Sequence, residues 1–264
     1  MKVLIVGGGG REHAIAWKVA QSEKVEKIYC APGNAGIASV AECVPIGAMD
    51  FDGLVAFAKE KAIDLTVIGM DDPLVGGIVD AFEAAGLSVF GPRKNAAIIE
   101  GSKAFSKDLM KKYHIPTAAY ETFDNAQAAL DYIENATMPI VLKADGLALG
   151  KGVLICKTLE EARAGVKSIM TDKQFGSAGD HLVIEEFMTG REVSVLCFCD
   201  GTHIVPMTSA QDHKRAQDGD QGLNTGGMGT FSPSPFYTQE IQEYCEKHIY
   251  QPTMDAMKAC IRHN

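Results

Sequence analysis

Strand-like and helix-like segments alternate, with short connections, through the first ninety residues of the chain. Strands are expected at residues 3–6, 27–30, 65–69 and 88–90, and helices at 11–20, 52–61 and 74–85. Alternation of this kind predicts a doubly wound parallel sheet, with a ligand site at the carboxyl ends of its strands. Gly91-Pro92 closes the pattern, so we expect a Rossmann-like N-terminal domain over residues 1–100.

The pattern changes after a helical segment at residues 94–114. Helices are then expected at about 125–135 and 159–170, among paired strands at 138–143, 151–156, 181–187, 191–199 and 203–207. This order is typical of an α+β unit. A long polar, glycine-rich loop from Ser209 to about Pro235 follows, and then a helix at about 238–261. Because 264 residues exceed the usual single domain, we expect a second domain over 101–264.

Charge and cysteine content exclude several classes of function. The formal net charge is −9 and no basic run occurs, which argues against a nucleic-acid partner. No apolar stretch approaches the length that crosses a membrane, so no membrane association is expected. The seven cysteines form no C-x-x-C pair, and we expect reduced thiols in a cytoplasmic protein.

Two lysines and three glycines lie between two expected strands in Lys143-Ala-Asp-Gly-Leu-Ala-Leu-Gly-Lys-Gly-Val153. Glycines allow backbone N–H groups to approach an anion closely, and the lysines supply positive charge. The spacing is not that of a Walker A loop, because only three residues separate Gly146 from Gly150. The segment therefore predicts a hairpin flap over nucleotide phosphates, and the alternative is a tight hairpin with solvated lysines.

The glycine run Gly7–Gly10 lies between the first strand and the first helix. It does not fit the dinucleotide fingerprint, because Glu12 stands where a third glycine is needed and no acidic residue ends the second strand. An anion at the N-terminus of this helix is one interpretation. A turn that needs glycine only for packing is the other.

Two further segments carry polar side chains suited to a nucleotide. The strand at 181–187 ends in Glu185, Glu186 and Phe187, and the two carboxylates are expected on opposite faces. Glu192 is a second candidate for a ribose, although acidic strand ends are commonly just solvated. The loop 211–229 gathers cations, carboxylates, a histidine and several glycines, and its length favours a function.

Taken together, these segments resemble the phosphoribosylamine–glycine ligase (glycinamide ribonucleotide synthetase) family of the ATP-grasp superfamily. The resemblance covers essentially the whole chain, in order. It is carried by Gly7-Gly-Gly-Gly-Arg-Glu-His-Ala14, Ala31-Pro-Gly-Asn-Ala-Gly36, Lys143 to Val153, Glu185-Glu-Phe187, Gln211-Asp-His-Lys-Arg215 and Asn224-Thr-Gly-Gly-Met-Gly229. It implies a pre-ATP-grasp domain followed by an ATP-grasp domain with a lid subdomain at about 117–188, incomplete at its C-terminal end.

The resemblance also implies a reaction. ATP, glycine and 5-phosphoribosylamine would give glycinamide ribonucleotide, ADP and phosphate through a glycyl phosphate, with Mg²⁺ or Mn²⁺ as the metal, in a monomeric enzyme of purine biosynthesis. The alternatives are another ATP-grasp carboxylate–amine ligase or carboxylase of purine synthesis, and a non-catalytic ATP-binding module.

Motif matching assigns a role to each candidate residue. The lysines would hold the ATP phosphates under the flap, the strand end would take the adenine, and Glu192 would take the ribose. The ATP group is Lys103, Lys143, Gly146, Gly150, Lys151, Gly152, Glu185, Glu186, Phe187 and Glu192. The phosphoribosylamine group is Gly9, Gly10, Asn34, Asp72 and Pro73, with Asn224, Thr225 and Gly226 on the substrate phosphate. The catalytic group on the acyl-phosphate side is Asp212, Lys214 and Arg215.

Three departures from the family pattern matter. Asp72 stands where the family has a longer glutamate, and Leu223 stands where it has proline. The family's metal-binding Glu-Phe-Asn segment does not occur, so its metal ligands are expected beyond Asn264. A truncated chain or a degenerate paralogue is therefore expected, with no turnover by the 264 residues alone.

Overall fold

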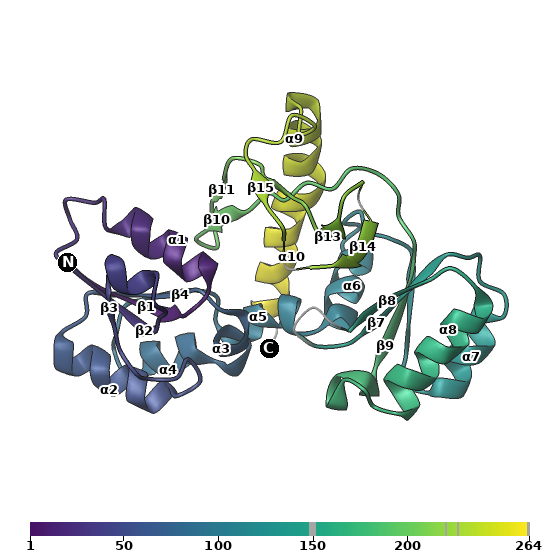
Figure 1. Ribbon diagram of the computed structural model, residues 1–264, viewed down its shortest axis with the longest axis horizontal. Coiled ribbons are helices and arrows are strands. Elements are labelled where there is room, and N and C mark those ends of the chain that lie inside the picture. The colour runs from purple at the N-terminus through teal and green to yellow at the C-terminus, as the bar shows by residue number, and fades with distance from the viewer. Residues whose placement is uncertain (148–151, 220, 226, 263–264) are drawn as a thin grey trace. The chain divides into compact units, whose positions relative to one another are not determined.

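The chain forms two compact units in the computed structural model, which describes residues 1–147, 152–219, 221–225 and 227–262 (Figure 1). The side chains at 223, 224, 261 and 262 lie outside this description. The first unit consists of Met1–Ser106, Ala144–Gly152 and Phe175–Asp180. The second unit consists of Lys107–Lys143, Val153–Gln174 and His181–Asn264. Each unit is described by itself below.

A five-stranded parallel sheet organises the first unit and confirms the expected doubly wound architecture. Its strand order is β3-β2-β1-β4-β5. The strands are β1 Lys2–Gly7, β2 Lys27–Pro32, β3 Glu42–Cys43, β4 Leu65–Ile68 and β5 Val89–Phe90. The chain reverses its direction of winding beside β1, so the loops after β1 and β4 meet at the carboxyl edge, where such folds bind ligands.

Helices cover both faces of this sheet (Figure 1). Alternate residues of β1 enter two separate cores: Val3 and Ile5 pack with Ala16 of α1, and Leu4 and Val6 pack in the cluster that holds Phe82 of α4. The helices are α1 Gly10–Val19, α2 Phe51–Lys61, α3 Asp71–Gly76, α4 Ile78–Ala84 and α5 Lys94–Gly101, with a 3₁₀ turn at Ile37–Ser39. An apolar strand buried on both faces is what a parallel sheet requires.

Two expected helices are interrupted. The helix expected at 74–85 breaks at Gly77, whose φ of +99° is left-handed and whose N–H ends α3 on the Pro73 carbonyl. The helix expected at 94–114 breaks at Ser102, where α6 (Lys103–Lys112) begins. The Asp145 carboxylate caps that new helix, because its Oδ1 accepts from the Lys103 and Ala104 N–H groups at 2.5 and 3.1 Å.

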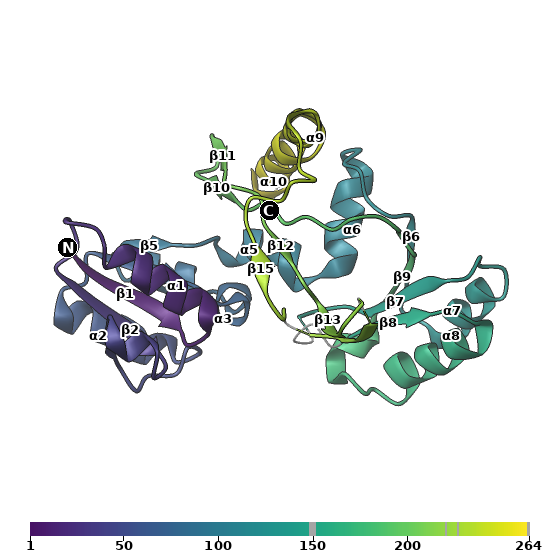
Figure 2. The same cartoon turned by 45° about the horizontal axis from the view of Figure 1, so that its top comes forward.

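The second unit contains a four-stranded sheet in the order β6-β9-β7-β8. In Figure 2, α7 (Ala126–Ile133) and α8 (Leu159–Val166) lie against one face of it. Gly165 lets α8 approach β7 closely, because a Cβ at Gly165 would lie 2.7 Å from Leu142 Cδ1 on that strand. The elements are β6 Tyr120–Phe123, β7 Ile140–Ala144, β8 Val153–Cys156 and β9 Leu182–Glu186, with α7 Ala126–Ile133 and α8 Leu159–Val166.

The segment expected to be a long loop contains short antiparallel strand pairs instead. Buried Ser209 and Ser234 fix its base, since Ser209 Oγ accepts from the Ser234 N–H at 3.1 Å. The strand expected at 191–199 is regular only over β10 Cys197–Cys199, which pairs with β11 Ile204–Pro206. The loop pairs are β12 Gln211–Asp212 with β15 Thr230–Phe231, and β13 Arg215–Gln217 with β14 Gln221–Asn224. The terminal helical region is α9 Gln239–Cys245, a π-helical stretch Glu246–Tyr250 and α10 Gln251–Arg262.

Two other expectations concern the environment of the protein. All seven cysteines are free thiols. Burial raises the pKa of the Cys30 thiol to about 12, so this group stays protonated at neutral pH. Among the described residues, none of the helices combines the length and apolarity needed to cross a membrane.

Replacing Thr158 with alanine is expected to lower the free energy of unfolding by about 1 kcal/mol. Thr158 is the N-cap of α8, and its Oγ1 accepts from the Glu161 N–H at 3.2 Å. Urea denaturation measures the change. Thr158→Ser keeps the hydroxyl and should stay close to the parent chain, whereas equal losses in both variants would show that the cap is not the cause.

Candidate functional site

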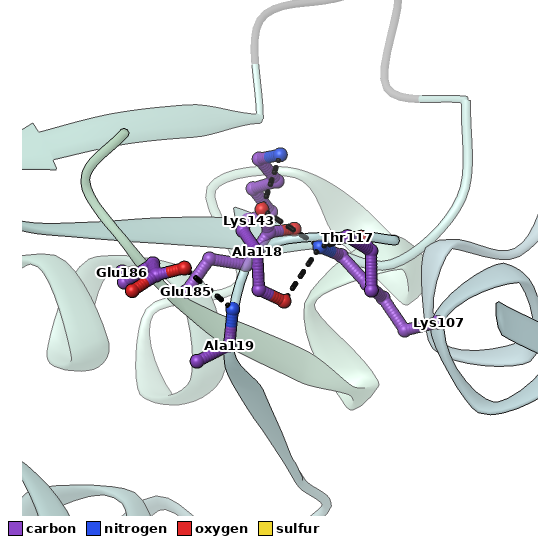
Figure 3. Close-up of polar contacts among 7 residues, drawn as sticks. All are labelled: Lys107, Thr117, Ala118, Ala119, Lys143, Glu185 and Glu186. Atoms are coloured by element: carbon purple, nitrogen blue, oxygen red, sulfur yellow. Dashed lines mark hydrogen bonds and ion pairs between the residues drawn. The ribbon is translucent and has the colours of Figure 1, made fainter. Parts of the chain in front are cut away.

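A buried carboxylate between two lysines lies at the end of β9 in the second unit (Figure 3). Glu185 Oε2 is 2.9 Å from Lys143 Nζ and 3.2 Å from Lys107 Nζ. The Glu185 side chain is 6 % exposed, so burial would be costly without these cations. The structure therefore brings together two predicted residues, Glu185 and Lys143, and adds Lys107, which sequence reasoning missed.

Glu186 points away from this cluster, as the strand pattern predicted (Figure 3). Its exposed side chain accepts from the Ala119 N–H at 2.9 Å, and its own N–H donates to the Ala119 carbonyl at 3.0 Å. These two bonds tie the end of β9 to the segment before β6. Phe187, the next residue, leaves the strand and contributes to a cavity.

A cavity of about 760 Å³ gathers five of the predicted residues in the second unit. They are Phe187, Glu192, Asp212, Lys214 and Arg215. Ile155 and Met228 add apolar surface, while Arg191 and His213 add polar groups that sequence reasoning did not select. Gly190, Gln211, Ala216, Gln217, Asp218 and Gly219 complete the wall. A wall that combines apolar side chains with a few charged groups is the usual composition of a small-molecule site.

The cations of this cavity are already engaged. Lys214 Nζ forms an ion pair with a Glu192 carboxylate oxygen, although the two residues are 22 positions apart. The Arg215 guanidinium donates to the Gly222 carbonyl at 2.8 Å, across the β13–β14 pair. The Arg191 guanidinium lies 3.8 Å from the centre of the Phe236 ring. Such contacts fix the directions of these groups before any ligand binds.

The rest of the glycine-rich loop has a mixed outcome. The Thr225 N–H donates to the Lys214 carbonyl at 2.6 Å, and the Thr225 hydroxyl accepts from the Gly227 N–H at 3.0 Å. Asn224 ends β14 opposite Arg215, and its side chain is not described. Gly226 lies outside the described residues.

The ends of the predicted flap are described in the first unit. Lys103 Nζ donates to the Gly146 carbonyl, and the Gly152 carbonyl accepts from the Ala144 N–H at 2.8 Å. Gly150 and Lys151 lie outside the described residues, so the flap itself stays a prediction. Asp145, also missed by sequence reasoning, holds the base of this loop through its contacts with α6.

The glycine run after β1 is closely packed on one side and open on the other. Buried Glu12 accepts from the Gly9 N–H at 2.6 Å, and a Cβ at Gly7 would lie 2.6 Å from its side chain. A Cβ at Gly8 would lie 2.7 Å from the Gly33 carbonyl oxygen, whereas one at Gly10 would meet nothing within 4 Å. The packing interpretation therefore holds for Gly7 and Gly8, and Gly10 faces open space.

Asn34 uses its side chain within the protein. Its Nδ2 donates to the Gly8 carbonyl at 2.9 Å, and its Oδ1 accepts from the Ile37 N–H at 2.9 Å. Asp72 and buried Pro73 lie in the first turn of α3, at the same carboxyl edge of the sheet. Nearby, the Arg11 guanidinium donates to the Gly69 carbonyl at 2.9 Å and pairs with Asp71 at 3.2 Å.

A metal site requires several hard ligands in one place. Within the part of the chain that the structure describes, no group of three His, Cys, Asp or Glu side chains is arranged to hold a metal ion. Glu192, Asp212 and Asp218 line one cavity without forming such a group. Among the described residues, these carboxylates therefore form no metal site from protein side chains alone.

Comparisons with known proteins agree along the chain. Residues 1–100 match the family described as phosphoribosylglycinamide synthetase, N domain, and residues 101–262 match phosphoribosylglycinamide synthetase, ATP-grasp (A) domain. The chain is 52 % identical over 261 residues to a phosphoribosylamine–glycine ligase of Pasteurella multocida, covering 98 % of this chain and 61 % of that protein. The enzyme of the same name from Halalkalibacterium halodurans is 53 % identical over 257 residues, with 97 % and 60 % covered.

Solved structures give the same pattern. The phosphoribosylamine–glycine ligase of Thermotoga maritima superposes with a TM-score of 0.81 at 33 % identity, covering 100 % of this chain and 62 % of that one. A biotin carboxylase domain from Hydrogenobacter thermophilus superposes with a TM-score of 0.75 at 16 % identity and shares the fold, covering 97 % of this chain and 58 % of that one. The chain spans about 61 % of the length of the curated relatives it matches.

Proposed function

This chain belongs to the phosphoribosylglycinamide synthetase family, and on that premise we propose that it acts in the ATP-dependent ligation of glycine to 5-phosphoribosylamine. The products would be glycinamide ribonucleotide, ADP and phosphate. The glycine carboxylate would attack the γ-phosphorus of ATP and release ADP. The phosphoribosylamine nitrogen would then attack the acyl carbon of the glycyl phosphate, expel phosphate and lose a proton.

The arrangement of the second-unit cavity is the observation that carries this proposal. Ile155, Phe187 and Met228 offer apolar surface to a purine ring in a cavity that charged groups also line. Glu192 would accept from the ribose hydroxyls, while Lys214 and Arg215 would stabilise charge on the acyl phosphate. Phosphoryl transfer depends on positioning and charge stabilisation more than on a protein nucleophile. Groups held by Glu192 and Gly222 before binding would supply that positioning.

The role of Lys143 follows from its surroundings. Its side chain is 28 % exposed, so the ammonium can reach a ligand while its stem stays against the protein. We assign Lys143, near the end of β7, to the ATP phosphates, and Glu185, near the end of β9, to the adenine. The family resemblance also predicts that Lys103 contacts the ATP phosphates. That resemblance also implies Mg²⁺ or Mn²⁺, for which the described carboxylates form no site of their own.

The first unit would bind 5-phosphoribosylamine at the carboxyl edge of its sheet. Gly10 presents its backbone N–H at the start of α1, where a phosphate is favoured. Gly9 would line the pocket with its backbone, because its own N–H is held by Glu12. Asn34 would act by holding the turn, because both ends of its amide are on backbone groups. Asp72 and Pro73 would lie beside the sugar. The free thiols fit a reducing compartment, so we place the protein in the cytoplasm.

Calorimetric titration tests the proposal. The chain is expected to bind a non-hydrolysable ATP analogue and then to bind glycine more tightly than formate or bicarbonate. Preference for formate or bicarbonate would favour another carboxylate-activating enzyme of the superfamily. If the chain bound the analogue but bound neither glycine, formate nor bicarbonate, a non-catalytic nucleotide-binding module would be favoured.

Replacing Lys143 with methionine is expected to weaken ATP binding about tenfold and AMP binding less than about twofold. AMP lacks the β- and γ-phosphates that the ammonium would contact. Titration calorimetry with both nucleotides measures the difference. Lys157→Met, at an exposed lysine just after β8, is the matched control and should change neither affinity. Equal losses for ATP and AMP in Lys143→Met would contradict the phosphate assignment.

A further inference from the structure

Lys107 is a buried lysine to which the proposed reaction gives no role. Its side chain is 9 % exposed and comes from α6, while its three acceptors lie on other segments (Figure 3). Nζ lies 2.8 Å from Thr117 Oγ1, 3.4 Å from the Ala118 carbonyl and 3.2 Å from Glu185 Oε2. An ammonium has three protons to donate, so these contacts use its full capacity. Lys107 is therefore held in one position by the folded chain.

Lys107 and Lys143 share a single oxygen of Glu185, but their environments differ. Lys107 is three-fold coordinated and buried, whereas Lys143 is 28 % exposed. One carboxylate between two ammonium groups leaves one positive charge in excess. Glu185 keeps a partner when one of the two lysines moves away, and the greater exposure of Lys143 makes it the one that can move.

We propose that Lys107 is a positioning residue: it is the standing counter-ion of Glu185, which allows Lys143 to transfer from Glu185 to the phosphates of a bound nucleoside triphosphate. This inference rests on the proposed function. Without Lys107, the departure of Lys143 would leave a buried carboxylate unpaired, and that cost would be subtracted from the binding free energy of the nucleotide. Lys107 thus acts on ATP through Glu185 and Lys143 without touching it.

Calorimetric titration of Lys107→Met tests the proposal. ATP binding should weaken about tenfold and AMP binding less than about twofold, because only ATP draws Lys143 away from Glu185. Lys107→Arg keeps the charge and should restore ATP binding to within about threefold. In Lys107→Met combined with Glu185→Gln, ATP affinity should return to within about threefold of Glu185→Gln alone, since no buried charge is left behind. Lys111→Met is the matched control. The ammonium groups of Lys107 and Lys111 both lie 5.5 Å from the centre of the Tyr120 ring, but Lys111 is exposed and has no contact with Glu185 among those described.

The outcomes separate this inference from the proposed function. Equal losses for ATP and AMP in Lys107→Met, or a loss that Glu185→Gln does not relieve, would make Lys107 a purely structural residue and overturn the inference. A parent chain that binds no ATP would instead overturn the proposed function. Urea unfolding of double-mutant cycles then still tests the counter-ion: the coupling of Lys107 to Glu185 should exceed that of Lys143 to Glu185 by about tenfold in the unfolding equilibrium constant. The reverse order would contradict the proposal.

Discussion

Replacing Glu185 with alanine is expected to lower the free energy of unfolding of the second unit by about 3–5 kcal/mol. The substitution removes the carboxylate that lies between Lys107 and Lys143 and leaves the Lys107 ammonium buried, at 9 % exposure, with neutral partners only. Removing one member of a buried ion pair costs more than the pair contributes, because the remaining charge is neither solvated nor neutralised. Hydrogen exchange of the β7 and β9 amides in urea reports on the unit concerned.

The chain offers two controls for this prediction. Glu186→Ala removes the adjacent but exposed carboxylate, which makes one bond to the Ala119 N–H, and should cost about 1 kcal/mol or less. Glu185→Leu combined with Lys107→Met replaces both buried charges by apolar groups and should recover most of the loss. If Glu185→Ala and Glu186→Ala were equally destabilising, the buried charge would not be the cause. Trp17, the single tryptophan, lies in the first unit, and its fluorescence should report little change.

Features governed by local pattern could be predicted from the sequence. The alternation of strands and helices gave the parallel sheet of the first unit, because short connections between buried strands leave few other topologies. The strand at 181–187 also gave the correct orientation of Glu185 and Glu186, since successive side chains of a strand point to opposite faces. Both inferences need only neighbours in the chain.

Lys107 shows why the rest could not be predicted. Helix α6 carries four lysines, at 103, 107, 111 and 112, and nothing local distinguishes the one that becomes buried. Its partner Glu185 is 78 positions away, and only the tertiary fold brings the two side chains together. The helix break at Ser102 has the same origin, because its cap is the side chain of Asp145, far along the chain.

The loop at 211–229 was difficult for a different reason. Its strands are only two to four residues long, which is too short for a recognisable alternation of apolar and polar residues. The sequence predicted a functional role for its cations. Lys214 and Arg215 line one cavity with Phe187, and their role there stays a prediction. The ion pair of Lys214 with Glu192 depends on a fold that the loop sequence alone does not specify.

Gly8→Ala is expected to destabilise the first unit, whereas Gly10→Leu is expected to leave its stability nearly unchanged and to weaken ligand binding. Gly8→Ala should lower the free energy of unfolding of the first unit by about 3 kcal/mol, because its Cβ would lie 2.7 Å from the backbone oxygen of Gly33. The Gly33 carbonyl oxygen can move away from this Cβ only if the backbone of its turn shifts. Gly10→Leu should change stability by less than about 1 kcal/mol, since its Cβ meets nothing within 4 Å and leucine is a good helix former. Trp17 fluorescence in urea measures both changes, because Trp17 lies on α1, the helix that starts at Gly10.

If the open space beside Gly10 is the sugar-phosphate pocket, Gly10→Leu should weaken the binding of a sugar phosphate although it leaves stability nearly unchanged. Ribose 5-phosphate is a stable probe that lacks only the reactive amine. Gly10→Leu should weaken its binding about a hundredfold, because the leucine side chain would occupy the volume that a phosphate needs to reach the N–H groups at the start of α1. A smaller loss is expected for Gly10→Ala, whose single methyl group fills less of that space. If Gly10→Leu bound ribose 5-phosphate as tightly as the parent chain, the open space beside Gly10 would not be the phosphate site. The sugar phosphate would then have to bind elsewhere.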